Sequence, residues 1–160
     1  MKILCLAGAY GSGKSFLANK LADLLPNTIV LPLAQALRLE LLASGKYSQQ
    51  ELFSKPTLPY VRCALQTRGD EQRAKYGETY WSQRWFISAN KSNKPNIICD
   101  DMRFITDYKE FCRYGETTLF FIGQDDANYD LSKLKVLADK QFTYKPEAKK
   151  VLAEWTKLNF

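Results

Sequence analysis

Eight residues near the amino terminus have the types and the spacing of a loop that binds phosphate: Gly8-Ala9-Tyr10-Gly11-Ser12-Gly13-Lys14-Ser15. The three glycines let the backbone curl so that successive N–H groups point at phosphate oxygens. We expect Lys14 to reach the β- and γ-phosphates of a nucleoside triphosphate and the Ser15 hydroxyl to bind Mg²⁺. The residues predicted to bind ATP are therefore Gly8, Gly11, Ser12, Gly13, Lys14 and Ser15.

A second group of chemically useful residues follows an apolar run, in the segment Ile97-Ile98-Cys99-Asp100-Asp101-Met102-Arg103. The carboxyl ends of parallel strands form the edge at which ligands bind, and an aspartate there helps hold Mg²⁺ in enzymes with this loop. We therefore predict that Asp100 or Asp101 joins Ser15 at the metal, and that Asp101 and Arg103 act in catalysis with Lys14. Two other interpretations stay open, because Asp101 could cap the next helix and Arg103 could neutralise the acidic pair.

A third group lies on one face of a predicted helix and consists of Arg62, Gln66, Gly69 and Arg73. Arginine matches phosphate with two parallel hydrogen bonds, so this face would suit a phosphomonoester. A glycine inside a helix costs about 1 kcal/mol relative to alanine, and close approach of a ligand is one reason for it. A helix break at Gly69 and a solvated charged face are the alternatives. Arg68 points away from this face.

The elements that must position these residues alternate between strand-like and helix-like patterns, which predicts an α/β fold. Five strands are predicted at residues 2–7, 28–31, 96–99, 117–122 and 141–144. The main helices are predicted at residues 14–25, 33–43, 60–76, 78–89 and 146–158, with another ending at residue 113 and a capping box at residues 48–51 opening a short one. We expect a five-stranded, mainly parallel sheet flanked by helices, the three-layer fold of the P-loop NTPases.

Composition limits the class of protein. The 160 residues suit one domain (1–160), and 46% hydrophobic residues argue against disorder. A net charge of +6 suits acidic ligands. The chain has no histidine, which excludes catalysis by an imidazole base and leaves its four cysteines without a zinc-site partner. We expect free thiols with Cys5 and Cys99 in the core, no signal peptide, no membrane span, and a soluble cytoplasmic protein.

With these motifs in order, the chain resembles the phage-type deoxynucleoside monophosphate kinases, relatives of adenylate kinase. The resemblance begins with the loop at residues 8–15 and continues with Pro32-Leu33-Ala34-Gln35-Ala36-Leu37-Arg38. It includes the helix that carries Arg62, Gln66, Gly69 and Arg73, followed by Gly77 and Trp81. It ends with Asp101-Met102-Arg103-Phe104 and the tail at residues 138–144.

The resemblance implies the sheet order of that family and transfer of the γ-phosphoryl group of ATP, with Mg²⁺, to a deoxynucleoside monophosphate. Arg62, Arg73 and Arg38 would then meet the substrate phosphate and Gln66 would read the base, inside a helical part at about residues 33–90. Tyr80 and Trp81 would line the pocket or belong to the core, and the core is expected for Trp81. The resemblance would also place the protein in a host cytoplasm.

The chain departs from this family in the segment after the fourth strand. Such kinases close an arginine-bearing lid there, whereas residues 123–136 contain no arginine and only two lysines, Lys133 and Lys135. A short lid at about residues 124–136, with acidic residues at its start (Asp125, Asp126 and Asp130), leaves two alternatives open. One is a nucleotide-binding sensor, and the other is a small-molecule kinase of the same fold with a non-nucleotide acceptor. The expected partners are small nucleotides. The arginines cluster on one helix, which argues against nucleic acid, and no membrane partner is expected because no membrane span is predicted. A homodimer stays open.

Overall fold

The computed structural model describes residues 1–123, 129–143 and 146–159. Within these residues, one sheet runs in the order β2-β3-β1-β4-β5, with parallel pairing throughout. Its strands are β1 (Lys2–Ala7), β2 (Thr28–Val30), β3 (Asn96–Met102), β4 (Glu116–Ile122) and β5 (Lys140–Phe142). The predicted five-stranded sheet is therefore confirmed, and its carboxyl edge carries the ends of β1 and β3.

The helices described agree with the predicted ones to within a few residues, with one addition at α7. They are α1 (Lys14–Leu24), α2 (Gln35–Ala43), α3 (Gln49–Phe53), α4 (Pro59–Tyr76), α5 (Tyr80–Lys91), α6 (Ile105–Tyr114), α7 (Tyr129–Leu137) and α8 (Ala148–Asn159). No helix in the described part of the chain is both long enough and apolar enough to cross a membrane.

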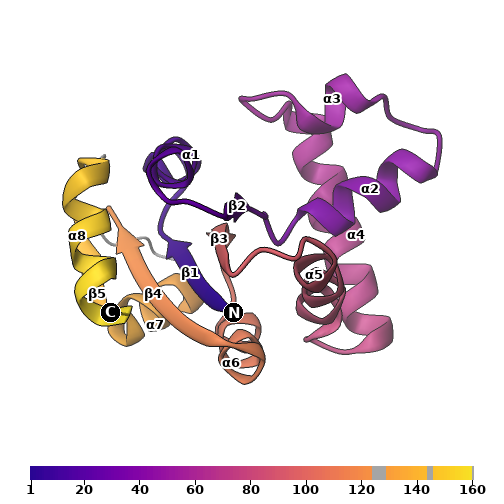
Figure 1. Cartoon of the computed structure of the whole chain (residues 1–160). Helices are drawn as coiled ribbons and strands as arrows, with labels where there is room; N and C mark the ends of the chain where they lie inside the picture. Colours follow the sequence, from indigo (N-terminus) through magenta and orange to yellow (C-terminus); the bar gives the residue numbers. More distant parts are fainter. Residues whose placement is uncertain (124–128, 144–145, 160) are drawn as a thin grey trace.

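Helices cover both faces of the sheet (Figure 1). Alternating side chains of the central strand, β1, pack against them. Leu4 and Leu6 face α1 and α8, where Trp155 is fully buried. Ile3 and Cys5 face the other way, toward α5, α6 and α7. Burial on both faces explains why β1 is apolar along nearly its whole length, as expected for a parallel sheet covered by helices. The two layers of helices and the sheet between them confirm the predicted three-layer arrangement.

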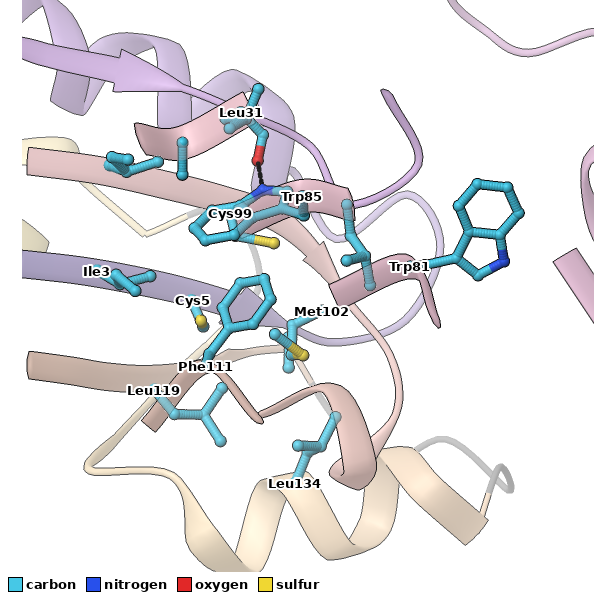
Figure 2. Packing of buried hydrophobic residues seen from close by; sticks show 14 of the residues in the cluster. Ile3, Cys5, Leu31, Trp81, Trp85, Cys99, Met102, Phe111, Leu119 and Leu134 are labelled. Atoms are coloured by element: carbon cyan, nitrogen blue, oxygen red, sulfur yellow. Dashed lines mark hydrogen bonds between the residues drawn. The ribbon is translucent and has the colours of Figure 1, made fainter. Parts of the chain in front are cut away.

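Trp85 connects helix α5 to the end of β2 and to α6 (Figure 2). The indole N–H of Trp85 on α5 donates to the carbonyl of Leu31, just beyond β2, at 2.8 Å. Its ring stacks on Phe111 of α6 with 4.0 Å between ring centres. Trp85 therefore holds α5 against the end of β2 and against α6. Trp81, one turn earlier, belongs to the same core, as predicted.

Helices α2 to α5 extend beyond the β2 edge of the sheet and pack on one another there (Figure 1). They occupy the region predicted at about residues 33–90 to bind a substrate. The capping box at Ser48 and Glu51 is confirmed at the start of α3. Helix α4 runs through Gly69 without interruption, so the alternative of a helix break at that glycine is wrong.

Helix α7 lies in the segment for which the sequence predicted a lid and no helix. Leu131 and Leu134 are buried against the core, so this part of the segment packs on the body of the sheet. The other lid residues, 124–128, lie outside the described residues, as does Tyr144 at the end of the predicted last strand. The predicted burial of Cys5 and Cys99 is confirmed, and all four cysteines are free thiols.

Candidate active site

The phosphate loop connects β1 to α1 and lies against the end of β4. Gly8 has a φ of 138°, and a Cβ atom there would lie 2.1 Å from the carbonyl oxygen of Ile122. Only glycine fits this position without moving the backbone. Gly13, with a φ of 92°, is the N-cap of α1 and carries no side chain to occupy the first N–H groups of the helix. These groups are the donors that a phosphate would accept from.

Lys14 folds back over this loop. Its ammonium donates to the carbonyl oxygens of Gly8 and Ala9 at 2.8 and 2.6 Å and to the Ser12 hydroxyl at 3.0 Å. Burial first, and then the nearby positive charge of Arg103, lower the pKa of Lys14 from 10.5 to about 8, against the opposing effects of Asp100 and Asp101. Among the described residues the ammonium contacts only neutral oxygens of the loop, so the oxygens of a bound phosphate would give it a negatively charged partner.

Asp100 is a buried residue of β3, and its carboxylate interacts with the Ser15 hydroxyl. Its side chain is almost fully buried, and its Oδ1 atom has no hydrogen-bond partner among the described residues. Burial raises the pKa of Asp100, with the charge of Asp101 next in importance, while the Ser15 hydroxyl and the ammonium of Lys55 act in the opposite direction. An orphaned carboxylate oxygen beside a hydroxyl is a suitable pair of ligands for Mg²⁺, which prefers oxygen.

Asp101 has a different role from its neighbour. Its two carboxylate oxygens accept the backbone N–H groups of Leu33 and Ala34 at 2.6 and 3.0 Å. The carboxylate therefore ties the start of α2 to the end of β3. It does not cap the helix that follows it, α6, whose N-cap is Phe104. Of the two candidates for the metal, the geometry leaves Asp100 with the available oxygen. Within the described residues no group of three His, Cys, Asp or Glu side chains could hold a metal ion by itself. Ser15 and phosphate oxygens would therefore have to join Asp100 in binding Mg²⁺.

Lys55 is a residue of this site that the sequence analysis missed. It lies between α3 and α4, and its ammonium donates to the Ser15 hydroxyl at 2.9 Å. The same nitrogen is 4.0 Å from Oδ2 of Asp100. Nothing in the local sequence Ser54-Lys55-Pro56 marks this lysine, because its partners are supplied by distant segments.

The predicted acceptor face comes to the phosphate loop through Arg62 and Gln66. They line a cavity of about 450 Å³ together with Tyr10, Pro56, Thr57, Pro59 and Cys63. The Arg62 guanidinium lies over the Tyr10 ring, 3.9 Å from its centre. Tyr10 belongs to the phosphate loop, so the cavity and the loop share a wall.

Arg73 and Gly69 lie elsewhere on α4 and have other partners. Arg73 forms an ion pair with Asp107 of α6 and lies 4.0 Å above the Phe104 ring. Asp107 is fully buried, and burial raises its pKa against the opposing effects of Arg73 and Ser82. In this structure Arg73 therefore neutralises a carboxylate of the protein itself and does not line the cavity.

Gly69 packs between helices. A Cβ atom there would make an ordinary contact of 3.7 Å with Leu37, and its carbonyl accepts the indole N–H of Trp81 at 3.2 Å. The glycine thus lies against α2 and α5, and the cavity is lined by other residues of α4. Because an alanine side chain would also fit here, the packing by itself does not require a glycine at this position.

Three further arginines, Arg38, Arg103 and Arg68, differ in their contacts. Arg38 on α2 has a buried Nε atom with no hydrogen-bond partner among the described residues, and its guanidinium lies 6.0 Å from the Phe53 ring centre. Arg103 is exposed just after β3, close enough for its positive charge to lower the pKa of Lys14. Arg68 pairs with Glu40 of α2 and does not line the cavity.

Comparisons with known proteins identify the fold. No protein-family model matches the chain, and no curated protein matches it either. Solved structures do match over nearly the whole length. The APS kinase of Mycobacterium tuberculosis has a TM-score of 0.54 at 16% identity, covering 98% of this chain and 95% of that one. The shikimate kinase of Bacteroides thetaiotaomicron has a TM-score of 0.52 at 12% identity, covering 99% and 97%.

A third match, the shikimate kinase of Aquifex aeolicus, has a TM-score of 0.50 at 15% identity, covering 98% of this chain and 95% of that chain. The chain therefore has the P-loop fold of shikimate-kinase-like small-molecule kinases, with a five-stranded parallel sheet flanked by helices.

Proposed function

We propose that this protein is an ATP-dependent phosphotransferase whose small acceptor binds in the cavity beside Arg62 and Gln66. The observation that carries the proposal is the shared position of Tyr10. This residue belongs to the phosphate loop and also lines the acceptor cavity, so a triphosphate on the loop would point its last phosphate toward the acceptor. Phosphoryl transfer depends mainly on such alignment and on neutralising charge.

Each charged residue has a separate task in this proposal. Lys14 would bind the β- and γ-phosphates once it leaves the loop carbonyls, and Arg103 would add positive charge from the end of β3. Ser15 and Asp100 would hold Mg²⁺, which supplies neutralisation of the phosphate charge. Asp101 positions the start of α2 and so keeps the helical part against the sheet.

We propose a deoxynucleoside monophosphate as the acceptor, with ADP and a diphosphate as products. A guanidinium fork at Arg62 suits its phosphate, and the amide of Gln66 offers both a donor and an acceptor to a base edge. Arg38, with its unpartnered nitrogen, is a further candidate for the phosphate. Because Arg73 is paired with Asp107, it is no longer counted among the phosphate-binding residues of this proposal.

A second candidate is a small acceptor that is not a nucleotide. Two observations favour it: the fold neighbours include shikimate kinases, and Arg62 is the one charged residue among those that line the cavity in the described structure. A single guanidinium is enough to bind one carboxylate through two parallel hydrogen bonds. A nucleotide-binding sensor without turnover is the remaining alternative.

A coupled ADP-release assay with a panel of acceptors tests these proposals together. The panel contains the four deoxynucleoside monophosphates, their ribose counterparts and shikimate, which is not a nucleotide. Turnover with monophosphates supports the first acceptor class, and turnover with shikimate supports the second. Tight ATP binding without any turnover contradicts transferase activity and supports the sensor.

Lys14→Ala is the control that assigns any turnover to this site. The substitution removes bonds within the phosphate loop and leaves the two hydrophobic clusters untouched, so the fold should persist by circular dichroism. Transfer should fall by at least about 10²–10³-fold, the typical loss for one electrostatic contact in a transition state. Near-normal turnover in the variant would refute the assignment.

A further inference from the structure

The ammonium of Lys55 lies where a P-loop enzyme is expected to hold its divalent cation. It is 2.9 Å from the Ser15 hydroxyl and 4.0 Å from a carboxylate oxygen of Asp100. These two side chains come from the start of α1 and the end of β3, and Lys55 comes from neither. It belongs to the connection between α3 and α4, on the acceptor side of the site.

The neighbouring contacts indicate that this position is built into the fold. Glu51 on α3 accepts a hydrogen bond from the hydroxyl of Tyr60 on α4 at 2.5 Å. This bond joins the two helices on either side of the connection that carries Lys55. Glu51 also completes the capping box with Ser48. The next residues, Pro56 and Thr57, line the acceptor cavity. Lys55 therefore lies between the phosphate loop and the place of the acceptor.

Two cations cannot occupy the space between Ser15 and Asp100 together, because like charges at such short distances repel strongly. Arrival of Mg²⁺ with a nucleotide must displace the ammonium. The lysine side chain is 59% exposed and has a flexible four-carbon stem, so the ammonium can move a few ångströms without moving the backbone. The nearest new negative charge would be the terminal phosphate.

We propose that Lys55 is a catalytic residue that exchanges one partner for another: its ammonium occupies the Ser15–Asp100 position in the free protein and contacts the transferring phosphoryl group when Mg²⁺ takes that position. The inference rests on the proposed phosphotransferase function and adds a residue to it. In the step itself, the bond from the γ-phosphorus to the bridging oxygen breaks and its electron pair stays on ADP. With a monophosphate as the acceptor, a bond forms from the γ-phosphorus to an anionic oxygen of that phosphate, so no proton is released and Lys55 exchanges none.

In this role Lys55 would bring a positive charge to the transferring phosphoryl group, a charge that no arginine supplies from the segment after β4. Residues 123–136 contain no arginine. A lysine on the acceptor side, one residue from the cavity wall, can serve the same electrostatic purpose at the transferring group.

The test uses Lys55→Ala and Lys55→Arg, with Lys46→Ala as the matched control because it removes another exposed lysine of the same helical part. With the best acceptor from the panel, Lys55→Ala should lower kcat by about 10²–10³-fold and change KM for the acceptor much less. Lys55→Arg should recover most of that loss, and Lys46→Ala should behave as the wild type. A wild-type kcat in Lys55→Ala overturns the proposal.

A second measurement separates this inference from the proposed function. The Mg²⁺ concentration that gives half-maximal binding of a fluorescent ATP analogue should be lower in Lys55→Ala, on the order of 5–10-fold, because a competing cation is gone. Lys46→Ala should show no shift. If the wild type transfers phosphate to none of the acceptors, the function fails while this shift still supports the exchange. An unchanged Mg²⁺ dependence in Lys55→Ala overturns the exchange even if transfer is found.

Discussion

The Arg62 guanidinium stacks on the Tyr10 ring, with 3.9 Å between the guanidinium carbon and the ring centre. The two residues come from α4 and the phosphate loop, 52 positions apart in the sequence. Their contact joins the helical part of the protein to the phosphate-binding part. It also forms part of the wall of the cavity in which we propose that the acceptor binds.

Arg62→Ala should therefore raise the KM for the acceptor far more than the KM for ATP. Loss of a hydrogen bond to a charged group costs about 1.5–3 kcal/mol, which corresponds to about 10–150-fold in KM for the acceptor. Steady-state kinetics with each substrate varied in turn measures the two KM values. Arg113→Ala removes an exposed arginine at the end of α6 and is the control. Equal effects on both KM values would argue against an acceptor role for Arg62.

The two neighbouring aspartates should respond in opposite ways to replacement by asparagine. Asp100→Asn should abolish most Mg²⁺-dependent transfer without lowering the free energy of unfolding. Burial raises the pKa of Asp100, so its ionised form opposes folding at neutral pH, and a neutral amide relieves that cost.

Asp101→Asn should instead destabilise the fold by about 1–3 kcal/mol, since an amide offers a single acceptor oxygen to the N–H groups of Leu33 and Ala34. Urea unfolding and a Mg²⁺ titration of activity measure both effects. A stable Asp101→Asn variant with lost metal dependence would reverse the assignment of the two residues.

Arg73→Ala should act first on stability. The substitution leaves the buried carboxylate of Asp107 without its cation, and breaking such a pair typically costs about 3–5 kcal/mol. Thermal and urea unfolding measure the loss. Adding Asp107→Asn to the variant should recover part of the stability, because no buried charge then remains unpaired. A stable Arg73→Ala variant with a raised acceptor KM would return this arginine to the substrate site.

Glu51 should contribute stability that depends on pH. Hydrogen bonds from Ser48 and Tyr60 lower the pKa of Glu51 from 4.5 to about 2. A lowered pKa in the folded protein means that the ionised carboxylate stabilises the fold above pH 4.5, and that this contribution is lost as the pH falls toward 2.

Glu51→Gln should therefore lower the Tm at pH 7, and its difference from the wild type should shrink between pH 4.5 and pH 2. Scanning calorimetry across this range measures the difference. Glu78→Gln, at an exposed position before α5, is the control. A difference that stays constant with pH would contradict the lowered pKa.

The sequence alone determined the features that depend on neighbouring residues. The phosphate loop could be predicted because its geometry is set by eight consecutive residues, with glycines at the positions that need positive φ or close approach. The strands were visible as apolar runs because burial on both faces selects such residues. The placement of Arg62 and Gln66 on one face of a helix followed from helical periodicity in the same way.

Only the tertiary structure decided which charges meet. Asp100 and Asp101 are adjacent and chemically identical, and they are distinguished by backbone N–H groups that α2 brings to Asp101 from nearly 70 residues away. Arg73 has the right type and face for a phosphate, but α6 places a buried carboxylate beside it. Lys55 has no motif, and it reaches Ser15 across 40 residues. Local patterns specify which residues share an element, whereas long-range packing selects the partner of each charge, since burial makes an unpaired charge costly wherever the chain brings it.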